Sequence, residues 1–203
     1  MLSKILIKRI LLIFIFSGLT LFIALLLYFF LKNPIQNGLT LNIKNTAILS
    51  NQKQIDIGLP IRLKIPSIKV NAPIEYVGLT SDGAMDVPKG PNETVWLDIG
   101  PRPGEKGSSV IAGHYGWKNN IPAVFDNLHK LRAGDEVFIE DEKKLIITFI
   151  VREIKIYEKD ETVLEVFNLN DEKSHLNLIT CMGNWNIEEK TRSKRLVVFT
   201  DKK

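Results

Sequence analysis

The chain opens with an uninterrupted apolar segment, residues 10–31, which contains no charged residue and is dominated by Leu, Ile and Phe. As a helix rising about 1.5 Å per residue it would extend about 33 Å, enough to cross a bilayer core of about 30 Å. Basic residues precede it at Lys4, Lys8 and Arg9, and the positive-inside rule then places residues 1–9 in the cytoplasm. The pattern predicts a single-pass transmembrane helix in the cell membrane, with the remainder of the chain extracellular.

A cleaved signal peptide is the alternative for this segment, but its apolar region would be shorter and would end in small residues at a cleavage site. The segment ends instead in aromatic residues, Tyr28, Phe29 and Phe30, which favours an uncleaved anchor. Residues 32–58 follow, rich in Asn and Gln, with sparse apolar positions and no sustained period. We expect a stalk or linker there.

From residue 59 to residue 203 the pattern changes to short β-prone runs broken by Pro, Gly and Asp, which predicts an all-β barrel or sandwich. In the run 145–157 polar residues interrupt the apolar ones without strict alternation, which indicates a β-bulge. Residues 123–131 have apolar side chains at helical spacing and predict one short helix. The candidate strands are residues 61–65, 68–70, 74–77, 108–112, 136–140, 145–157, 176–181 and 195–200.

Length and charge narrow the possible functions. The 203 residues allow one domain of ordinary size in addition to the anchor. The net charge of +4 is mild, and Lys and Arg are scattered among Asp and Glu without a basic stripe, so nucleic-acid binding has no support. The single cysteine excludes an internal disulfide. It leaves an inert buried thiol, an intermolecular bridge or a reactive thiolate as alternatives.

The residues that could perform chemistry lie at the ends of predicted strands. His114 directly follows the apolar run that ends at residue 112 and is flanked by glycines, so its ring can project into a cleft. A turn histidine bonded to nearby backbone is the structural alternative. Cys181 ends the strand predicted over residues 176–181, and Arg195 opens the last apolar run. Polar groups at strand ends of a small barrel can converge on one mouth, so these three residues form the candidate site.

The other two histidines are interpreted as residues without a catalytic role. His129 lies on the predicted helix and is interpreted as a surface or packing residue, and His175 at the start of a strand as a solvated turn residue. A zinc site made of His114, His175 and Cys181 would need a fourth ligand or a water, and the spacings match no finger or ribbon pattern.

Three segments, in chain order, carry a resemblance to a known family: AGHYGW, LNLITCMG and TRSKRLVVFT. They resemble the signature segments of sortases, and LKIPSIKVNAPIEYVG and FDNLHKLRAGDEVFIE are also similar to that family, so that the resemblance covers roughly Leu59 to Thr200. It implies a closed β-barrel of about eight strands with one or two short helices. The segment 78–114, especially Met85 to Trp96 and Gly100 to Gly104, looks closest to sortase classes D to F. Leu196 and Val197, however, stand where class F members often carry Asp-Asn.

Carried over residue by residue, the resemblance implies that Cys181 is the nucleophile, His114 its acid/base partner, and Arg195 the residue that stabilises the reacting carbonyl. Thr180 falls on a position that lines the substrate groove in the family. Arg192 competes with Arg195 for the arginine role, but Arg195 directly precedes the apolar strand, as the family pattern requires.

The implied activity is that of a cysteine transpeptidase (thiol protease). It would cleave an LPxTG-like sorting signal of a secreted protein and transfer the acyl group to an amine on a Gram-positive cell-wall precursor or a pilin. No cofactor is implied; some relatives use a calcium ion to order a loop, and no acidic cluster in this sequence supports such a site. A papain-like or NlpC-type hydrolase would place its cysteine before its histidine and at the start of a helix. The alternative from another class is a non-catalytic, membrane-anchored domain for adhesion or scaffolding.

Overall fold

The computed structural model describes residues 19, 22, 23, 25, 27, 28, 56–167 and 171–203. Two compact units are present, Met1–Gln54 and Ile55–Lys203. In the first unit the described residues are helical, whereas most of the predicted span 10–31 and of the predicted linker lies outside the described residues. Over the part of the chain that is described, no helix is both long and apolar enough to cross a membrane. The transmembrane helix therefore stays a prediction.

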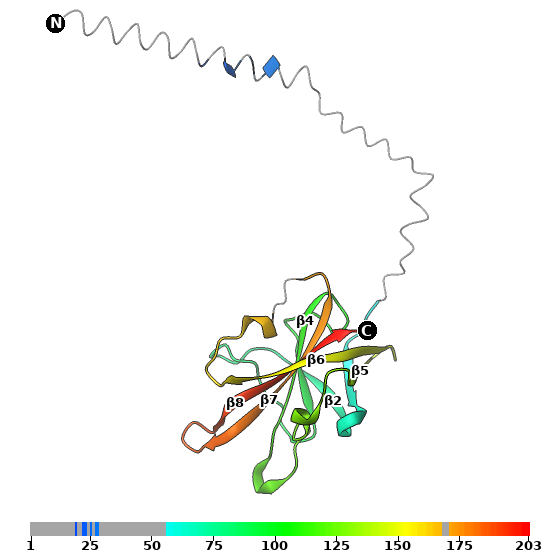
Figure 1. Ribbon diagram of the computed structural model, residues 1–203, viewed down its shortest axis with the longest axis vertical. Helices are drawn as coiled ribbons and strands as arrows, with labels where there is room; N and C mark the ends of the chain where they lie inside the picture. The colour runs from blue at the N-terminus through cyan, green and yellow to red at the C-terminus, as the bar shows by residue number, and fades with distance from the viewer. Residues whose placement is uncertain (1–18, 20–21, 24, 26, 29–55, 168–170) are drawn as a thin grey trace, which may run out of the picture. The chain divides into compact units, whose positions relative to one another are not determined.

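The second unit is an all-β closed barrel, as the sequence predicts (Figure 1). Around the barrel the strands follow the order β1-β2-β3-β4-β7-β8-β6-β5. Neighbours pair antiparallel except for β2 with β3 and β4 with β7, which are parallel. The strands are β1 (Pro60–Ile65), β2 (Val70–Val77), β3 (Thr94–Leu97), β4 (Gly107–Gly113), β5 (Glu136–Asp141), β6 (Ile146–Glu158), β7 (Ser174–Asn186) and β8 (Thr191–Lys202).

Side chains alternate between the two faces of each strand, and the apolar ones form two separate clusters. Leu176 and Leu178 of β7 point into the main core, which fills the barrel together with residues such as Leu63 and Ile111. The residues of the opposite faces form a second, smaller cluster of Leu97, Val110, Val166, Val197 and Phe199, against which Ile179 packs. Since successive side chains of a strand point to opposite sides, this second cluster lies on the outer face of β4, β7 and β8. Part of the outer face is therefore covered, and it is the face on which Cys181 stands.

The helices described in this unit are single 3-10 turns: η2 (Pro66–Ile68), η3 (Lys118–Asn120), η4 (Leu128–Lys130) and η5 (Leu164–Val166). The longer helix predicted over residues 123–131 is wrong, because turns and η4 occupy that segment. Phe125, Leu128 and Leu131 are its fully buried residues. Their spacing of three fits the 3-10 geometry of three residues per turn better than it fits an α-helix.

Strand limits differ from the prediction at several places. The bulge expected in the run 145–157 is present, as a register shift between Val151 and Glu153 where β6 pairs with β8. Strand β3 was not predicted, because its four residues, all buried, are too few to show an alternating pattern. Strands β7 and β8 are longer than predicted because they continue as a hairpin beyond the end of β4.

The last residues of the predicted linker pack on the barrel. Ile57 belongs to the main core, and its carbonyl oxygen accepts a hydrogen bond of 2.8 Å from Arg102 Nη1. The amide of Gly58 donates to Asp141 Oδ2 at 2.7 Å. These contacts attach the chain to the rim of the barrel before β1 begins.

Candidate active site

Strand pairing brings the three candidate residues into one row. Strands β4 and β7 run parallel with Ala112 level with Ile179. Strand β4 ends at Gly113, so His114 comes directly after the end of β4, beside the stretch of β7 that carries Cys181. Strands β7 and β8 are antiparallel, with Cys181 directly opposite Arg195. Residues paired in this way on neighbouring strands point to the same face. The row therefore lies across the outer face of the barrel in the order His114, Cys181, Arg195.

Cys181 is partly exposed and unbridged. It lies inside β7, and Arg195 lies inside β8, so the expectation that both residues mark strand ends is wrong. The reason is the hairpin beyond the barrel, where the register shifts between Met182 and Trp185. Gly183 allows this shift because its φ is +84°, and a Cβ there would lie 2.4 Å from Ser193 Oγ. What ends next to Cys181 is the neighbouring strand β4, which leaves the thiol beside an open edge.

His114 directly follows β4, as predicted, and its ring is held on two sides. The Nε2 atom lies 2.8 Å from the carbonyl oxygen of Pro88, and the ring packs on Trp117 with 4.7 Å between centroids. A carbonyl oxygen only accepts hydrogen bonds, so Nε2 carries the proton and Nδ1 is the nitrogen that can accept one. Pro88 thus fixes the tautomer of His114, and since it acts through its backbone, no residue type in the sequence signals this role.

Thr180 lies on the inner face of β7 and is 4% exposed. Its hydroxyl donates to the carbonyl oxygen of Gly113 at 2.7 Å. This bond joins the residue before Cys181 to the residue before His114, and it ties the end of β4 to the middle of β7. The predicted contact of Thr180 with substrate stays a prediction.

The two arginines occupy different places. The guanidinium of Arg195 donates to the carbonyl oxygens of Arg192 at 2.9 Å and Lys194 at 3.0 Å, and to Thr191 Oγ1 at 3.0 Å. A guanidinium has five N–H donors, so these bonds leave donors with which it can bind a substrate. Arg192 lies instead over the ring of Tyr115, with 4.9 Å from Cζ to the ring centroid. Arg192 therefore contacts the loop after His114, whereas Arg195 belongs to the row with Cys181.

The remaining histidines lie away from the row. His129 is exposed on η4, as predicted. The expectation of a solvated His175 is wrong, because its side chain is 1% exposed. Its Nδ1 lies 2.7 Å from Asp201 Oδ1, and its Nε2 lies 2.7 Å from Asp171 Oδ1. Two carboxylates satisfy the ring where it is buried, a pairing that its position after four polar residues did not reveal.

A metal site gains no support from these positions. Both ring nitrogens of His175 already face carboxylates. Among the described residues, no group of three or more His, Cys, Asp or Glu side chains is arranged to hold a metal ion.

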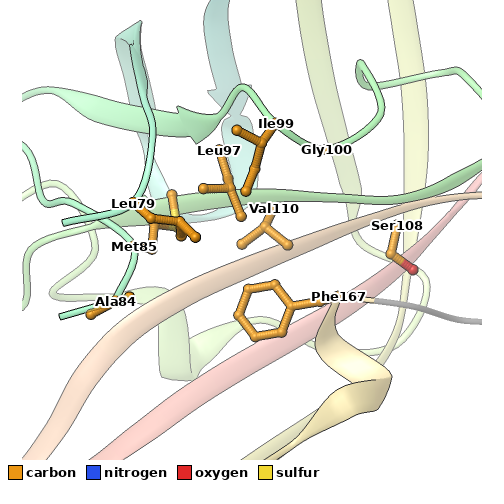
Figure 2. Close-up of a pocket in the computed structure, with 10 residues that line it drawn as sticks. Leu79, Ala84, Met85, Leu97, Ile99, Gly100, Ser108, Val110 and Phe167 are labelled. Atoms are coloured by element: carbon orange, nitrogen blue, oxygen red, sulfur yellow. The ribbon is translucent and has the colours of Figure 1, made fainter. Parts of the chain in front are cut away.

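An apolar pocket of about 460 Å³ lies on the same outer face as the row. Val110 of β4 forms its floor, and Leu97, Ile99 and Phe167 converge on it from neighbouring segments (Figure 2). Val110 precedes His114 along β4 and points to the same side, so the pocket and the row share one strand. The sequence did not indicate this pocket, because its lining comes from separate segments: Leu79, Gly83, Ala84, Met85, Leu97, Ile99, Gly100, Ser108, Val110 and Phe167.

Comparison with known proteins agrees with this architecture. The family model described as Sortase domain matches residues 63–203. Among solved structures, sortase C-1 from Actinomyces oris is similar, with a TM-score of 0.56 and 25% identity over 78% of this chain and 80% of that one. Sortase C from Clostridium perfringens SM101 gives a TM-score of 0.52 at 25% identity, over 72% and 71% of the two chains.

The lid mutant of sortase A from Corynebacterium diphtheriae is 23% identical, with a TM-score of 0.56 over 75% of this chain and 74% of that one, and shows the likeness of fold alone. No curated protein matches the chain. These structures are sortases of classes C and A, so the likeness to classes D to F stays a prediction. Because the sortase family model accounts for residues 63–203, well over half of the 203 residues, the chain belongs to the sortase family.

Proposed function

We propose that this sortase domain cleaves an LPxTG-like sorting signal through a thioester on Cys181 and transfers the acyl group to an amine. The observation that carries the proposal is that Cys181 pairs directly with Arg195 on adjacent strands, while His114 directly follows the end of the neighbouring strand β4. A reactive thiol, an acid/base group and a permanent cation side by side are what acyl transfer from an amide requires.

The reaction follows from the position of each group. His114 takes the proton of the Cys181 thiol on Nδ1, the resulting thiolate attacks the carbonyl carbon of the scissile peptide bond, and a tetrahedral intermediate forms. His114 gives a proton to the leaving amine nitrogen, the C–N bond breaks, and a thioester remains on Cys181. The acceptor amine then attacks the thioester and loses a proton to His114, and the thiolate is regenerated. The overall reaction exchanges one amide bond for another, so it needs no oxidant, reductant or cofactor.

Arg195 and the apolar pocket supply the binding contacts in this proposal. The Arg195 guanidinium, one strand away from Cys181, donates hydrogen bonds to the substrate backbone or to the oxyanion, which in comparable sites contributes a few kcal/mol. The pocket along β4 receives an apolar side chain of the sorting signal on the acyl side of the scissile bond. Its lining of Leu, Ile, Val, Met and Phe side chains suits such a residue.

We further propose that residues 10–31 anchor the protein in the cell membrane and that the catalytic domain faces outward, where secreted proteins and an amine of the cell wall or a pilin would meet it. The support is the uncharged apolar run and the basic residues before it. Membrane fractionation should recover the full chain in the pellet after alkaline washing. A chain lacking residues 1–31 that remained equally bound to membranes would contradict the anchor.

The activity is tested with the full-length protein, purified in detergent, and a set of LPxTG-like peptides and primary amines, with products identified by mass spectrometry. We expect cleavage within the motif and an amine-dependent transpeptidation product. A non-catalytic adhesion or scaffold domain would give neither product, and its function would survive Cys181→Ala.

A further inference from the structure

The row across the barrel continues beyond Arg195 onto β6. Strands β6 and β8 pair with Tyr157 directly opposite Arg195. Tyr157 therefore points to the same outer face as Arg195 and Cys181, and its ring packs against the outer apolar cluster. Neither the sequence motifs nor the proposed chemistry gives this residue a role.

The hydroxyl of Tyr157 donates a hydrogen bond to Glu165 on η5. Lys155, on the same face of β6, lies 3.1 Å and 3.4 Å from the two carboxylate oxygens of Glu165. Burial, and then the carboxylate beside it, raise the pKa of Tyr157. The bonds from Tyr157 and then from Lys155 lower the pKa of Glu165. Near neutral pH the phenol is thus protonated and the carboxylate ionised, the charge-assisted form of this bond.

Glu165 belongs to a short segment that connects the row to the pocket. The next residue, Val166, is buried in the outer apolar cluster, and its carbonyl oxygen accepts a bond of 2.6 Å from Asn177 Nδ2 of β7. Phe167 follows and lines the pocket (Figure 2). Two strands of the barrel therefore hold η5, β6 through Tyr157 and Lys155 and β7 through Asn177. The position of η5 sets the position of the pocket wall.

We propose that Tyr157 is a positioning residue that fixes η5, and with it Phe167, through its hydrogen bond to Glu165, so that the apolar pocket is formed before substrate arrives. Tyr157 touches no reacting atom, and its effect is on binding. A free segment of this kind would have to be ordered at the moment of binding, and that cost would appear as weaker affinity. The kinetic part of the proposal rests on the proposed transpeptidase function, whereas the ordering of η5 does not.

The test uses Tyr157→Phe, which removes the hydroxyl and keeps the ring, and Glu165→Ala, which removes the acceptor. The full-length protein is assayed for peptide cleavage and for amide hydrogen exchange at Val166 and Phe167, whose amides bond to Val163 and Leu164. In both variants we expect KM to rise about five- to tenfold with kcat within about twofold, and exchange at these amides to accelerate about tenfold, since hydrogen bonds to charged groups contribute factors of this order.

The matched control is Tyr76→Phe, on β2, whose ring packs edge-on against Trp96 instead of reaching η5. It should leave KM and the exchange of η5 unchanged. The double variant Tyr157→Phe/Glu165→Ala should be no worse than Glu165→Ala alone, because Glu165→Ala already removes the acceptor of the Tyr157 bond together with that of the Lys155 bonds. Unchanged exchange at Val166 and Phe167 in Tyr157→Phe would overturn the proposal, as would faster exchange across the whole barrel. If the wild-type protein cleaves no peptide, the proposed function fails while the exchange result still decides whether Tyr157 holds η5.

Discussion

Thr180→Val removes one hydroxyl and keeps the size of the side chain, and it tests whether the hydrogen bond between β7 and the end of β4 aligns the site. The hydroxyl is buried and bonds to Gly113 at 2.7 Å. Loss of such a buried bond costs about 1–3 kcal/mol of stability. For a domain of this size that corresponds to a fall in Tm of about 2–12 °C.

The effect on activity should exceed the effect on stability. Gly113 directly precedes His114, so loosening it displaces the acid/base group relative to Cys181, and a displacement of about 1 Å can cost about a hundredfold in rate. We expect Thr180→Val to lower kcat/KM at least about tenfold at a temperature where the protein is fully folded. Thr180→Ser, which retains the hydroxyl, should recover most of this loss.

Thr200→Val is the matched control. Its hydroxyl is also buried and donates to the carbonyl oxygen of Leu176 at 2.7 Å, between the same kind of groups but away from the row. It should destabilise the protein to a similar extent and leave kcat/KM within about twofold. Thermal unfolding and peptide cleavage measure the two quantities. Equal losses of kcat/KM in Thr180→Val and Thr200→Val would refute the alignment role.

Three further predictions concern binding, the domain boundary and pH. Arg195→Lys keeps the charge but loses the planar donor geometry, so it should lower kcat/KM about tenfold or more in cleavage assays. Arg192→Lys should change kcat/KM less. A larger loss in Arg192→Lys than in Arg195→Lys would mean that Arg192, not Arg195, binds the substrate. Ile57→Ala should lower the free energy of unfolding in urea by about 2 kcal/mol, because Ile57 belongs to the core. An unchanged free energy of unfolding would mean that the residues before β1 are not part of the folded domain. The pKa of Glu165 lies below its ordinary value of 4.5, so its stabilising contribution is present above that pH and lost as the pH falls through the folded-state pKa. The Tm difference between wild type and Glu165→Ala should therefore shrink as the pH falls through the lowered folded-state pKa of Glu165, and a Tm difference that does not depend on pH in the acid range would refute this linkage.

The candidate site could be predicted from the sequence where a short apolar run marks a strand next to a reactive residue. His114 and Cys181 each follow an apolar run, and those runs became the parallel neighbours β4 and β7. The sequence could not show that Cys181 lies inside its strand, because the hairpin beyond it is exposed and shows no alternation of apolar and polar residues. Pro88 contacts His114 through its own backbone carbonyl, and the Thr180 hydroxyl donates to the backbone carbonyl of Gly113. Every residue has a carbonyl, so the sequence does not reveal which carbonyls take these roles.

The barrel was predictable where strands alternate and unpredictable where segments are short or irregular. Strand β3 has four residues and all are buried, so it has no period. The helix expected over residues 123–131 became turns, because Phe125 packs in the core with Leu128 and Leu131 and the segment follows tertiary packing instead of helical period. The pocket and the bond between Tyr157 and Glu165 depend on loops whose positions are set only when the barrel closes.

The most direct test of the central claim is intact-mass analysis of the protein during turnover of a sorting-signal peptide, with wild type, Cys181→Ala and His114→Ala. The chain has one cysteine, so a thioester can form only on Cys181. The wild-type protein should gain the mass of the acyl fragment and lose it when an acceptor amine is added. Cys181→Ala should show neither adduct nor cleavage, and His114→Ala should not turn over amides although iodoacetamide still labels Cys181. Cleavage that survives Cys181→Ala would contradict the account.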